Sequence, residues 1–146
     1  MRYKRKTGKK TIQSKKGVYD GIKFASQLEI FMYKALKSAN IDFGYETEVF
    51  DLIEGFHSKN VSFERTAAKP MINRGEKKVR GIIYTPDFVS KHFIIETKGR
   101  ANESFPMRWK LFKRLLHLSN DNRVLYKPQS QADCKLVIED ILKRFN

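Results

Sequence analysis

Hydrophobic positions along this chain recur with two different periods. Apolar residues return at helical spacing over residues 24–40, 105–119 and 131–145, and each stretch is predicted to be an amphipathic helix. Rough alternation or short continuous apolar runs predict strands over residues 43–53, 61–72, 77–89, 93–98 and 123–127. This order of elements predicts an α/β domain, a mixed β-sheet flanked by helices.

Turn residues and the polar N-terminus set the expected boundaries. The sequence Asn-Arg-Gly-Glu at 73–76 is typical of a turn, so residues 77–89 are expected to return antiparallel to residues 61–72. Residues 1–20 have no apolar period and carry eight Lys and Arg before their first acid, Asp20. We therefore expect a flexible basic arm over residues 1–20 and a single domain over residues 21–146.

The net charge of the chain limits the classes of partner that we expect. Thirty Lys and Arg against 16 Asp and Glu give a formal net charge of +14. Such an excess repels itself in the folded state and usually serves a polyanion, and we expect that polyanion to be DNA. A membrane partner is not expected, because no long basic amphipathic helix with a bulky apolar face is present. No apolar run suits a secretory signal or a membrane span, which predicts a cytoplasmic location.

Basic residues expected to contact DNA fall in three places: the N-terminal arm, the segment after residue 98, and the polar face of the helix at 105–119. They are Lys4, Arg5, Lys6, Lys9, Lys10, Lys15, Lys16, Arg100, Lys110, Lys113 and Arg114. Each Lys or Arg that neutralises a phosphate releases condensed counterions, which favours binding without reading the sequence.

Two short motifs carry the candidate chemistry. Pro86-Asp87 is followed, after eight intervening residues, by Glu96-Thr97-Lys98. Side chains alternate along a strand, so Glu96 and Lys98 are expected to share one face while the Thr97 side chain points away. If residues 82–89 and 93–98 pair as a hairpin, Asp87 lies across from that face. The two carboxylates and a backbone carbonyl, that of Thr97, would then suit a hard cation such as Mg²⁺, with Mn²⁺ as a substitute.

Lys98 and Glu29 complete the candidate site. Lys98 could orient or deprotonate an attacking water, or neutralise charge that develops on a phosphate. Glu29 lies at the edge of the apolar arc of the helix at 24–40, where it is expected to face a cleft between helix and sheet. Each motif alone is common on protein surfaces. Their combination with an apolar strand and a very basic chain favours an active site.

At these residues the chain resembles the PD-(D/E)xK nuclease superfamily, and within it the bacteriophage endonuclease I family of Holliday-junction resolvases. The resemblance covers residues 26–46 and 84–99. It implies a restriction-endonuclease-like fold in which Glu29, Asp87, Glu96 and Lys98 are catalytic around two metal ions. It also implies a homodimer with an exchanged element that cuts branched DNA in a bacterial or phage-infected cell. The spacing from Glu29 to Asp87 is longer here, and a basic stretch around residues 56–81 is expected to form a β-hairpin that touches DNA or a second subunit.

Other functions remain open on the sequence. The chain could be a nicking, mismatch-processing or restriction-like endonuclease, or the cutting subunit of a transposase. From a different class, it could be a non-catalytic basic protein that binds DNA or RNA on a decayed nuclease fold. A magnesium-dependent cleavage assay separates the last of these from the others.

Overall fold

The computed structural model describes residues 15–100 and 102–146, so the predicted DNA contacts Lys4, Arg5, Lys6, Lys9 and Lys10 lie outside the described residues. Its helices are α1 (Gln27–Ser38), α2 (Phe105–Leu118) and α3 (Gln131–Phe145). Its strands are β1 (Gly17–Tyr19), β2 (Ile22–Phe24), β3 (Gly44–Tyr45), β4 (Phe50–Ile53), β5 (Phe56–His57), β6 (Phe63–Thr66), β7 (Lys69–Asn73), β8 (Lys78–Val79), β9 (Ile82–Tyr84), β10 (Phe88–Val89), β11 (Phe93–Ile95) and β12 (Val124–Tyr126). The chain has an α/β fold, as predicted.

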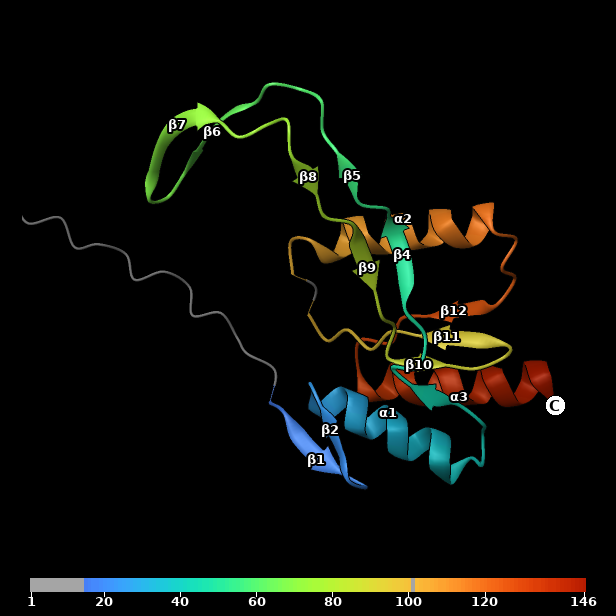
Figure 1. Ribbon diagram of the computed structural model, residues 1–146. Helices are drawn as coiled ribbons and strands as arrows, with labels where there is room; N and C mark the ends of the chain where they lie inside the picture. Colours follow the sequence, from blue (N-terminus) through green and yellow to red (C-terminus); the bar gives the residue numbers. More distant parts are fainter. Residues whose placement is uncertain (1–14, 101) are drawn as a thin grey trace, which may run out of the picture.

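A four-stranded mixed sheet lies between two helical layers (Figure 1). Its strand order is β12-β11-β10-β3, with β11 parallel to β12 and antiparallel to β10. Phe93 and Ile95 pack toward α1 and α3, while Ile94 packs toward α2. Alternate side chains of β11 therefore pack against the helices on opposite faces of the sheet, which explains why this strand is apolar at every position. No helix within the described ranges is both long and apolar enough to cross a membrane.

The N-terminal part of the described chain is more ordered than expected. β1 and β2 form a hairpin, so Gly17–Tyr19 is a strand rather than part of a flexible arm. The turn consists of Asp20 and Gly21, both with positive φ (52° and 72°), the conformation that Asp-Gly hairpin turns need. Because Phe24 belongs to β2, helix α1 begins at Gln27 and not at residue 24.

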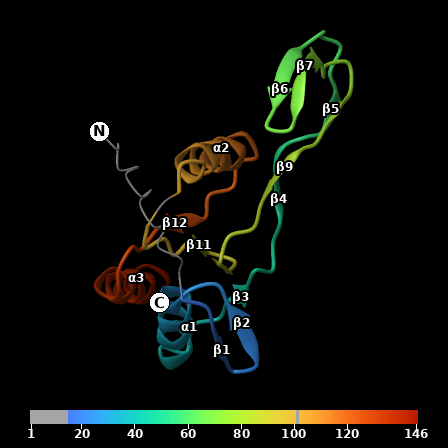
Figure 2. The same cartoon turned by 90° about the vertical axis from the view of Figure 1, so that its left-hand side faces the viewer.

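Residues 55–81 leave the body of the molecule as a long two-stranded extension, called the ribbon below (Figure 2). The chain reverses at Ala67 and Ala68, between β6 and β7. The predicted turn at 73–76 is wrong, because backbone bonds from Arg74 N to Ser62 O (2.7 Å) and from Glu76 N to Asn60 O (3.0 Å) continue the ladder through it. β4 and β9 join the ribbon to the body.

Candidate active site

Asp87 and the Glu96-Thr97 segment meet at one end of the central sheet. Phe88 pairs with Ile95, so Asp87 and Glu96 extend adjacent strands in the same register. The Asp87 Oδ2 atom accepts hydrogen bonds from the Thr97 N–H (2.7 Å) and the Thr97 hydroxyl (2.6 Å). The Thr97 side chain, expected to point away from the face of Glu96 and Lys98, therefore reaches Asp87, a contact that the sequence did not predict. Strand β11 ends at Ile95, and beyond it the strict alternation of side chains no longer decides which groups meet.

Glu96 and Lys98 lie on the α2 side of the sheet. The Tyr84 hydroxyl donates to Glu96 Oε2 at 2.7 Å, and the Lys98 ammonium lies 4.6 Å from the centre of the Phe105 ring. Tyr84 and Phe105 belong to the same apolar cluster under α2. These contacts confirm the prediction that Glu96 and Lys98 share a face. The role of Tyr84 was not predicted, and no sequence motif marks it.

Glu29 reaches the site from α1, on the opposite side of the sheet. It is 6% exposed, and its Oε2 atom accepts hydrogen bonds from the Tyr45 hydroxyl (2.8 Å) and the Ala25 N–H (3.1 Å). Its Oε1 atom accepts from the Ser26 hydroxyl, which in turn accepts from the Glu29 N–H. This reciprocal cap starts the helix and fixes the side chain inward, as the position on the apolar arc predicted.

The three carboxylates repel one another in a buried place. Glu29, Asp87 and Glu96 are 6–8% exposed. Burial, followed by the negative charges of Glu96 and Glu29, raises the pKa of Asp87 to about 8, although the Thr97 hydrogen bonds oppose the shift. Burial also raises the pKa of Glu96, against the lowering effects of the Tyr84 hydrogen bond and the Lys98 charge. Lys98 is a cation close enough to lower the pKa of Glu96 by its charge.

The donor set fits a hard divalent cation in its chemistry. Carboxylate oxygens are the ligands that Mg²⁺ prefers, and a bound cation would relieve the repulsion among the three groups. Within residues 15–100 and 102–146, no group of three or more His, Cys, Asp or Glu side chains is already arranged to hold a metal ion. The reason is visible in the contacts: Thr97, Tyr84 and Tyr45 each draw one carboxylate to a donor of the protein.

Basic side chains surround this acidic centre. Lys15, Lys98 and Arg100 line a cavity of about 510 Å³ that also touches Glu29 and Thr97. This places two predicted DNA-contacting residues, Lys15 and Arg100, in the same cavity as Glu29. Lys16, Lys110, Lys113 and Arg114 are exposed, the last three on the outer face of α2.

Trp109 anchors further positive charge near α2. It is 8% exposed and belongs to the core under that helix. Lys113 from α2 and Lys127 after β12 both place their ammonium groups 5.9 Å from the centre of the Trp109 ring. Lys127 was not among the predicted DNA contacts, since only the folded chain brings it beside α2.

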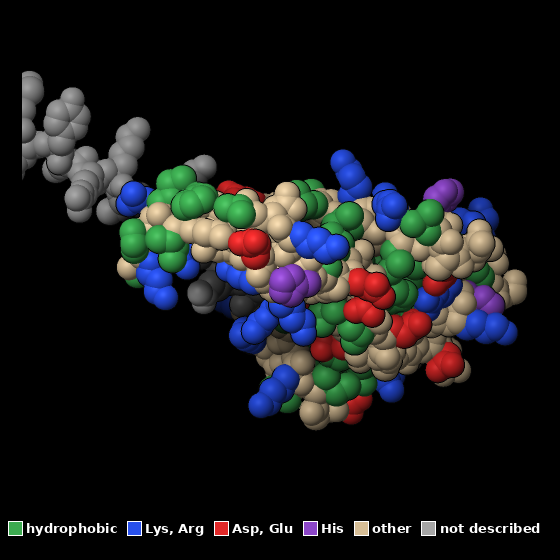
Figure 3. Space-filling view, turned by 45° about the horizontal axis from the view of Figure 1, so that its top comes forward, with side chains coloured by type: hydrophobic (Ala, Val, Ile, Leu, Met, Phe, Trp, Pro, Cys, Tyr) green, Lys and Arg blue, Asp and Glu red, His purple; other side chains and the backbone are tan. Residues whose placement is uncertain are grey.

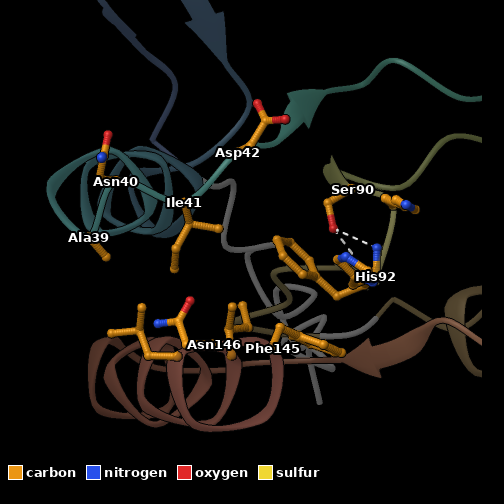
Figure 4. A pocket seen from close by; sticks show the side chains of 12 residues that line it. Ala39, Asn40, Ile41, Asp42, Ser90, His92, Phe145 and Asn146 are labelled. Carbon is orange, nitrogen blue, oxygen red and sulfur yellow. Dashed lines mark hydrogen bonds between the residues drawn. The ribbon is translucent and has the colours of Figure 1, made fainter.

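A second cavity lies between the C-terminal ends of α1 and α3 and the β10–β11 turn (Figure 4). Its volume is about 420 Å³, and Asp42 supplies its one acidic side chain. The His92 ring stacks on Phe145 with 5.1 Å between ring centres. The cavity contains none of the four predicted catalytic residues, so it is not a candidate nuclease site.

Comparison with known proteins gives a family but no described function. Neither the curated proteins nor the solved structures include a match to this chain. The sequence model of a family described as "Protein of unknown function (DUF1064)" matches residues 9–125. The matched segment contains Glu29, Asp87, Glu96 and Lys98, together with the whole ribbon, and ends within β12. Because the match spans most of the sequence, the chain belongs to the DUF1064 family.

Proposed function

We propose that this protein is a metal-dependent endodeoxyribonuclease that hydrolyses phosphodiester bonds at the sheet end occupied by Asp87. One observation carries the proposal. Three buried carboxylates, Glu29 on α1 and Asp87 and Glu96 at the ends of adjacent strands, lie close enough for their charges to raise carboxyl pKa values, and Lys98 lies beside Glu96. Carboxyl groups whose pKa values are raised by burial and by neighbouring charges cluster at functional sites, and carboxylates beside a lysine suit phosphate chemistry with a divalent cation.

Each residue has a role in this proposal. Glu29, Asp87 and Glu96 hold Mg²⁺ or Mn²⁺, with the backbone carbonyl of Thr97 as a further ligand. When bound, such a cation polarises a phosphate oxygen and lowers the pKa of a water molecule. Lys98 lies beside Glu96, where its ammonium group orients the attacking water or offsets charge on the phosphate.

Basic residues hold the substrate by its backbone. Lys15 and Arg100 line the cavity that contains Glu29, and the cations of α2 lie on the same side of the sheet as Glu96. Contacts of this kind position a nucleic acid without reading its sequence. Selectivity for branched DNA such as Holliday junctions is the finer proposal, and it rests on the resemblance of residues 26–46 and 84–99 to resolvases.

A matched pair of carboxyl-to-amide changes tests the activity. Four-way junctions and linear duplexes are incubated with the protein in Mg²⁺, Mn²⁺ or EDTA. Asp87→Asn removes a ligand charge and is expected to abolish cleavage while leaving DNA binding intact. Asp42→Asn, an exposed acid at the other cavity, is the control and is expected to keep both.

The outcomes separate the open functions. Near-normal cleavage by the Asp87→Asn protein rejects the site. Cleavage of linear duplex as fast as of junctions favours a nicking or restriction-like enzyme. A wild-type protein that binds DNA but cuts neither substrate with either metal is a non-catalytic binding protein on this fold.

A further inference from the structure

The ribbon carries an excess of positive charge that the protein itself does not neutralise. Residues 55–81 contain seven Lys and Arg and two Glu, a net charge of +5 (seven minus two). The basic residues are Lys59, Arg65, Lys69, Arg74, Lys77, Lys78 and Arg80. Among the residues that the structure describes, none of these seven forms a salt bridge. The charge is therefore available to a partner.

The ribbon also exposes apolar side chains along its length. Phe56, Phe63 and Met71 are 54%, 61% and 58% exposed, and no residue from Gly55 to Gly81 is buried. Figure 3 shows hydrophobic and basic side chains side by side at the ribbon end of the molecule. A two-stranded ribbon that packs on nothing is marginally stable in water, so a partner that covers these side chains would stabilise it.

We propose that the ribbon enters the major groove of duplex DNA and holds the duplex beside the carboxylates. This rests on the proposed function for the identity of the substrate, and it adds a contact that the active-site residues do not supply. The major groove of B-form DNA admits a two-stranded β-ribbon, whereas the major groove of A-form RNA is too narrow for side chains to enter. Basic side chains bind the phosphates on either side, and exposed apolar groups contact thymine methyls on the groove floor.

The base of the ribbon is linked directly to the site. Its return strand continues into β9, which ends at Tyr84, and the Tyr84 hydroxyl donates to Glu96. The start of the next strand then follows Asp87. DNA held in the ribbon is thus held by the same stretch of chain that positions two of the carboxylates.

Charge disfavours the other occupant of such a surface, a second copy of the ribbon. Two ribbons packed against each other would bring together two net charges of +5, and like charges that meet in an interface cost free energy. A polyanion removes the same repulsion by binding.

Binding measurements in EDTA with the full chain test the proposal without requiring cleavage. A labelled linear DNA duplex is titrated over a series of salt concentrations. The variant Arg65→Ala/Lys69→Ala removes two cations that flank the Ala67–Ala68 turn. The control Lys135→Ala/Lys143→Ala removes the same charge from the exposed face of α3.

The ribbon variant is expected to bind DNA more weakly, with a slope of log K against log salt that is shallower by about 0.9 for each phosphate that is no longer neutralised. The control is expected to keep the wild-type slope. Methylation of guanine N7, which lies in the major groove, is expected to weaken binding by the wild-type protein and to matter less for the ribbon variant. A double-stranded RNA of the same sequence is expected to be insensitive to the ribbon change.

Two results would overturn the proposal. The first is a ribbon variant whose affinity and salt slope equal those of the control. The second is a wild-type dimer in sedimentation without DNA that the change Phe63→Ser converts to a monomer, which assigns the ribbon to a second copy. If the ribbon variant binds DNA more weakly than the control but the wild-type protein never cuts DNA, only the nuclease function is rejected. If the protein cuts DNA but the ribbon variant binds it as the control does, only the ribbon contact is rejected.

Discussion

Each of the three carboxylates is held by a different set of hydrogen-bond donors. Asp87 accepts from both the backbone and the hydroxyl of Thr97, whereas Glu96 accepts from the Tyr84 hydroxyl. Glu29 accepts from its own helix cap and from Tyr45. Because these donors lower the pKa values of Asp87 and Glu96 while burial raises them, changes at single residues should alter stability and activity in opposite directions.

Asp87→Asn is expected to stabilise the cation-free protein at high pH. The folded-state pKa of Asp87, about 8, lies above its ordinary value of 3.8, so this carboxyl favours the unfolded state increasingly as pH rises between those values. A neutral amide removes that penalty and can still accept from Thr97. One pKa unit corresponds to about 1.4 kcal/mol, and we expect the free energy of unfolding in EDTA to rise by about 1–3 kcal/mol at pH 8.

Denaturant titrations at pH 4 and pH 8 check this expectation. The gain should be small at pH 4, where the wild-type carboxyl is largely protonated in the folded protein. A variant less stable than wild type at pH 8 would show that the geometry of the Thr97 bonds outweighs the charge.

Lys98→Ala is expected to slow cleavage by ~10²-fold or more, the usual scale for losing a positioned acid–base or charge-stabilising group. Lys98 lies over the Phe105 ring beside Glu96, which is where the proposed mechanism needs its ammonium group. Single-turnover rates at saturating enzyme measure the effect apart from binding. A change of only a few-fold would mean that Lys98 has no catalytic role.

Tyr84→Phe is expected to shift the pH dependence of cleavage to higher pH. The Tyr84 hydrogen bond lowers the pKa of Glu96, and its removal leaves a carboxylate oxygen buried without that donor. A higher pH is then needed to ionise Glu96 for ligation. Rate–pH profiles of the two proteins measure the shift. If the loss of activity at low pH has the same midpoint in both, ionisation of Glu96 does not control the rate-limiting step.

Whole helices could be predicted where the apolar residues keep one helical period from end to end. The helices over 105–119 and 131–145 agree with α2 and α3 within one residue, because each has an uninterrupted apolar stripe and a clear end. The hairpin at Asp20-Gly21 was missed although this dipeptide is a strong turn signal, because two three-residue strands give no measurable period.

The ribbon shows why turns are harder to locate than strands. Asn73 and Gly75 suggested a turn, yet the Asn73 side chain accepts from the N–H groups of Ser62 and Gly75, which keeps residues 73–76 within the ladder. The actual reversal at Ala67–Ala68 has no turn-forming residue at its centre. The turn-forming residues at 73–76 thus produce an irregularity within the strand, whereas the pairing of β6 with β7 determines where the chain reverses.

Gly75→Ala is expected to open the middle of the ribbon without unfolding the body. A Cβ atom at this position would overlap the Asn60 carbonyl oxygen and lie 2.6 Å from the Ser62 nitrogen, both backbone atoms. The strands must therefore separate there. Hydrogen exchange should show reduced protection for residues 58–77, while the amides of α1–α3 serve as an internal reference. Unchanged protection in the ribbon would mean that its backbone is less tightly paired than the structure has it.

At the scale of the whole molecule, the candidate site could be predicted because its chemistry is local in sequence. Asp87, Glu96 and Lys98 lie within twelve residues of one another, and the apolar arc of α1 oriented Glu29. Tyr84, Tyr45 and Lys127 could not be predicted, because they reach the site or its rim only through the packing of strands and of α2.

Two copies of the chain are expected to act together on a branched substrate. In the proposed reaction one set of Glu29, Asp87 and Glu96 would cut one strand, whereas resolving a junction needs two opposed incisions. Light scattering of the protein alone and bound to a four-way junction in EDTA measures the stoichiometry. Two protomers per junction are expected, with their sites on one DNA-binding face. A single protomer in the complex, cutting one strand per encounter, favours the nicking enzyme instead.

The cap of α1 has a consequence for metal affinity. The carboxylate of Glu29 that would hold a cation is the one that closes the first turn of its own helix through Ser26 and Ala25. A helix cap is worth about 0.5–2 kcal/mol, which corresponds to a roughly two- to thirtyfold change in a binding constant. A cation bound as proposed would therefore compete with the helix for the same oxygens. A weaker cap would then give a tighter metal site on a less stable helix, so Ser26 would tune metal affinity without being a metal ligand itself.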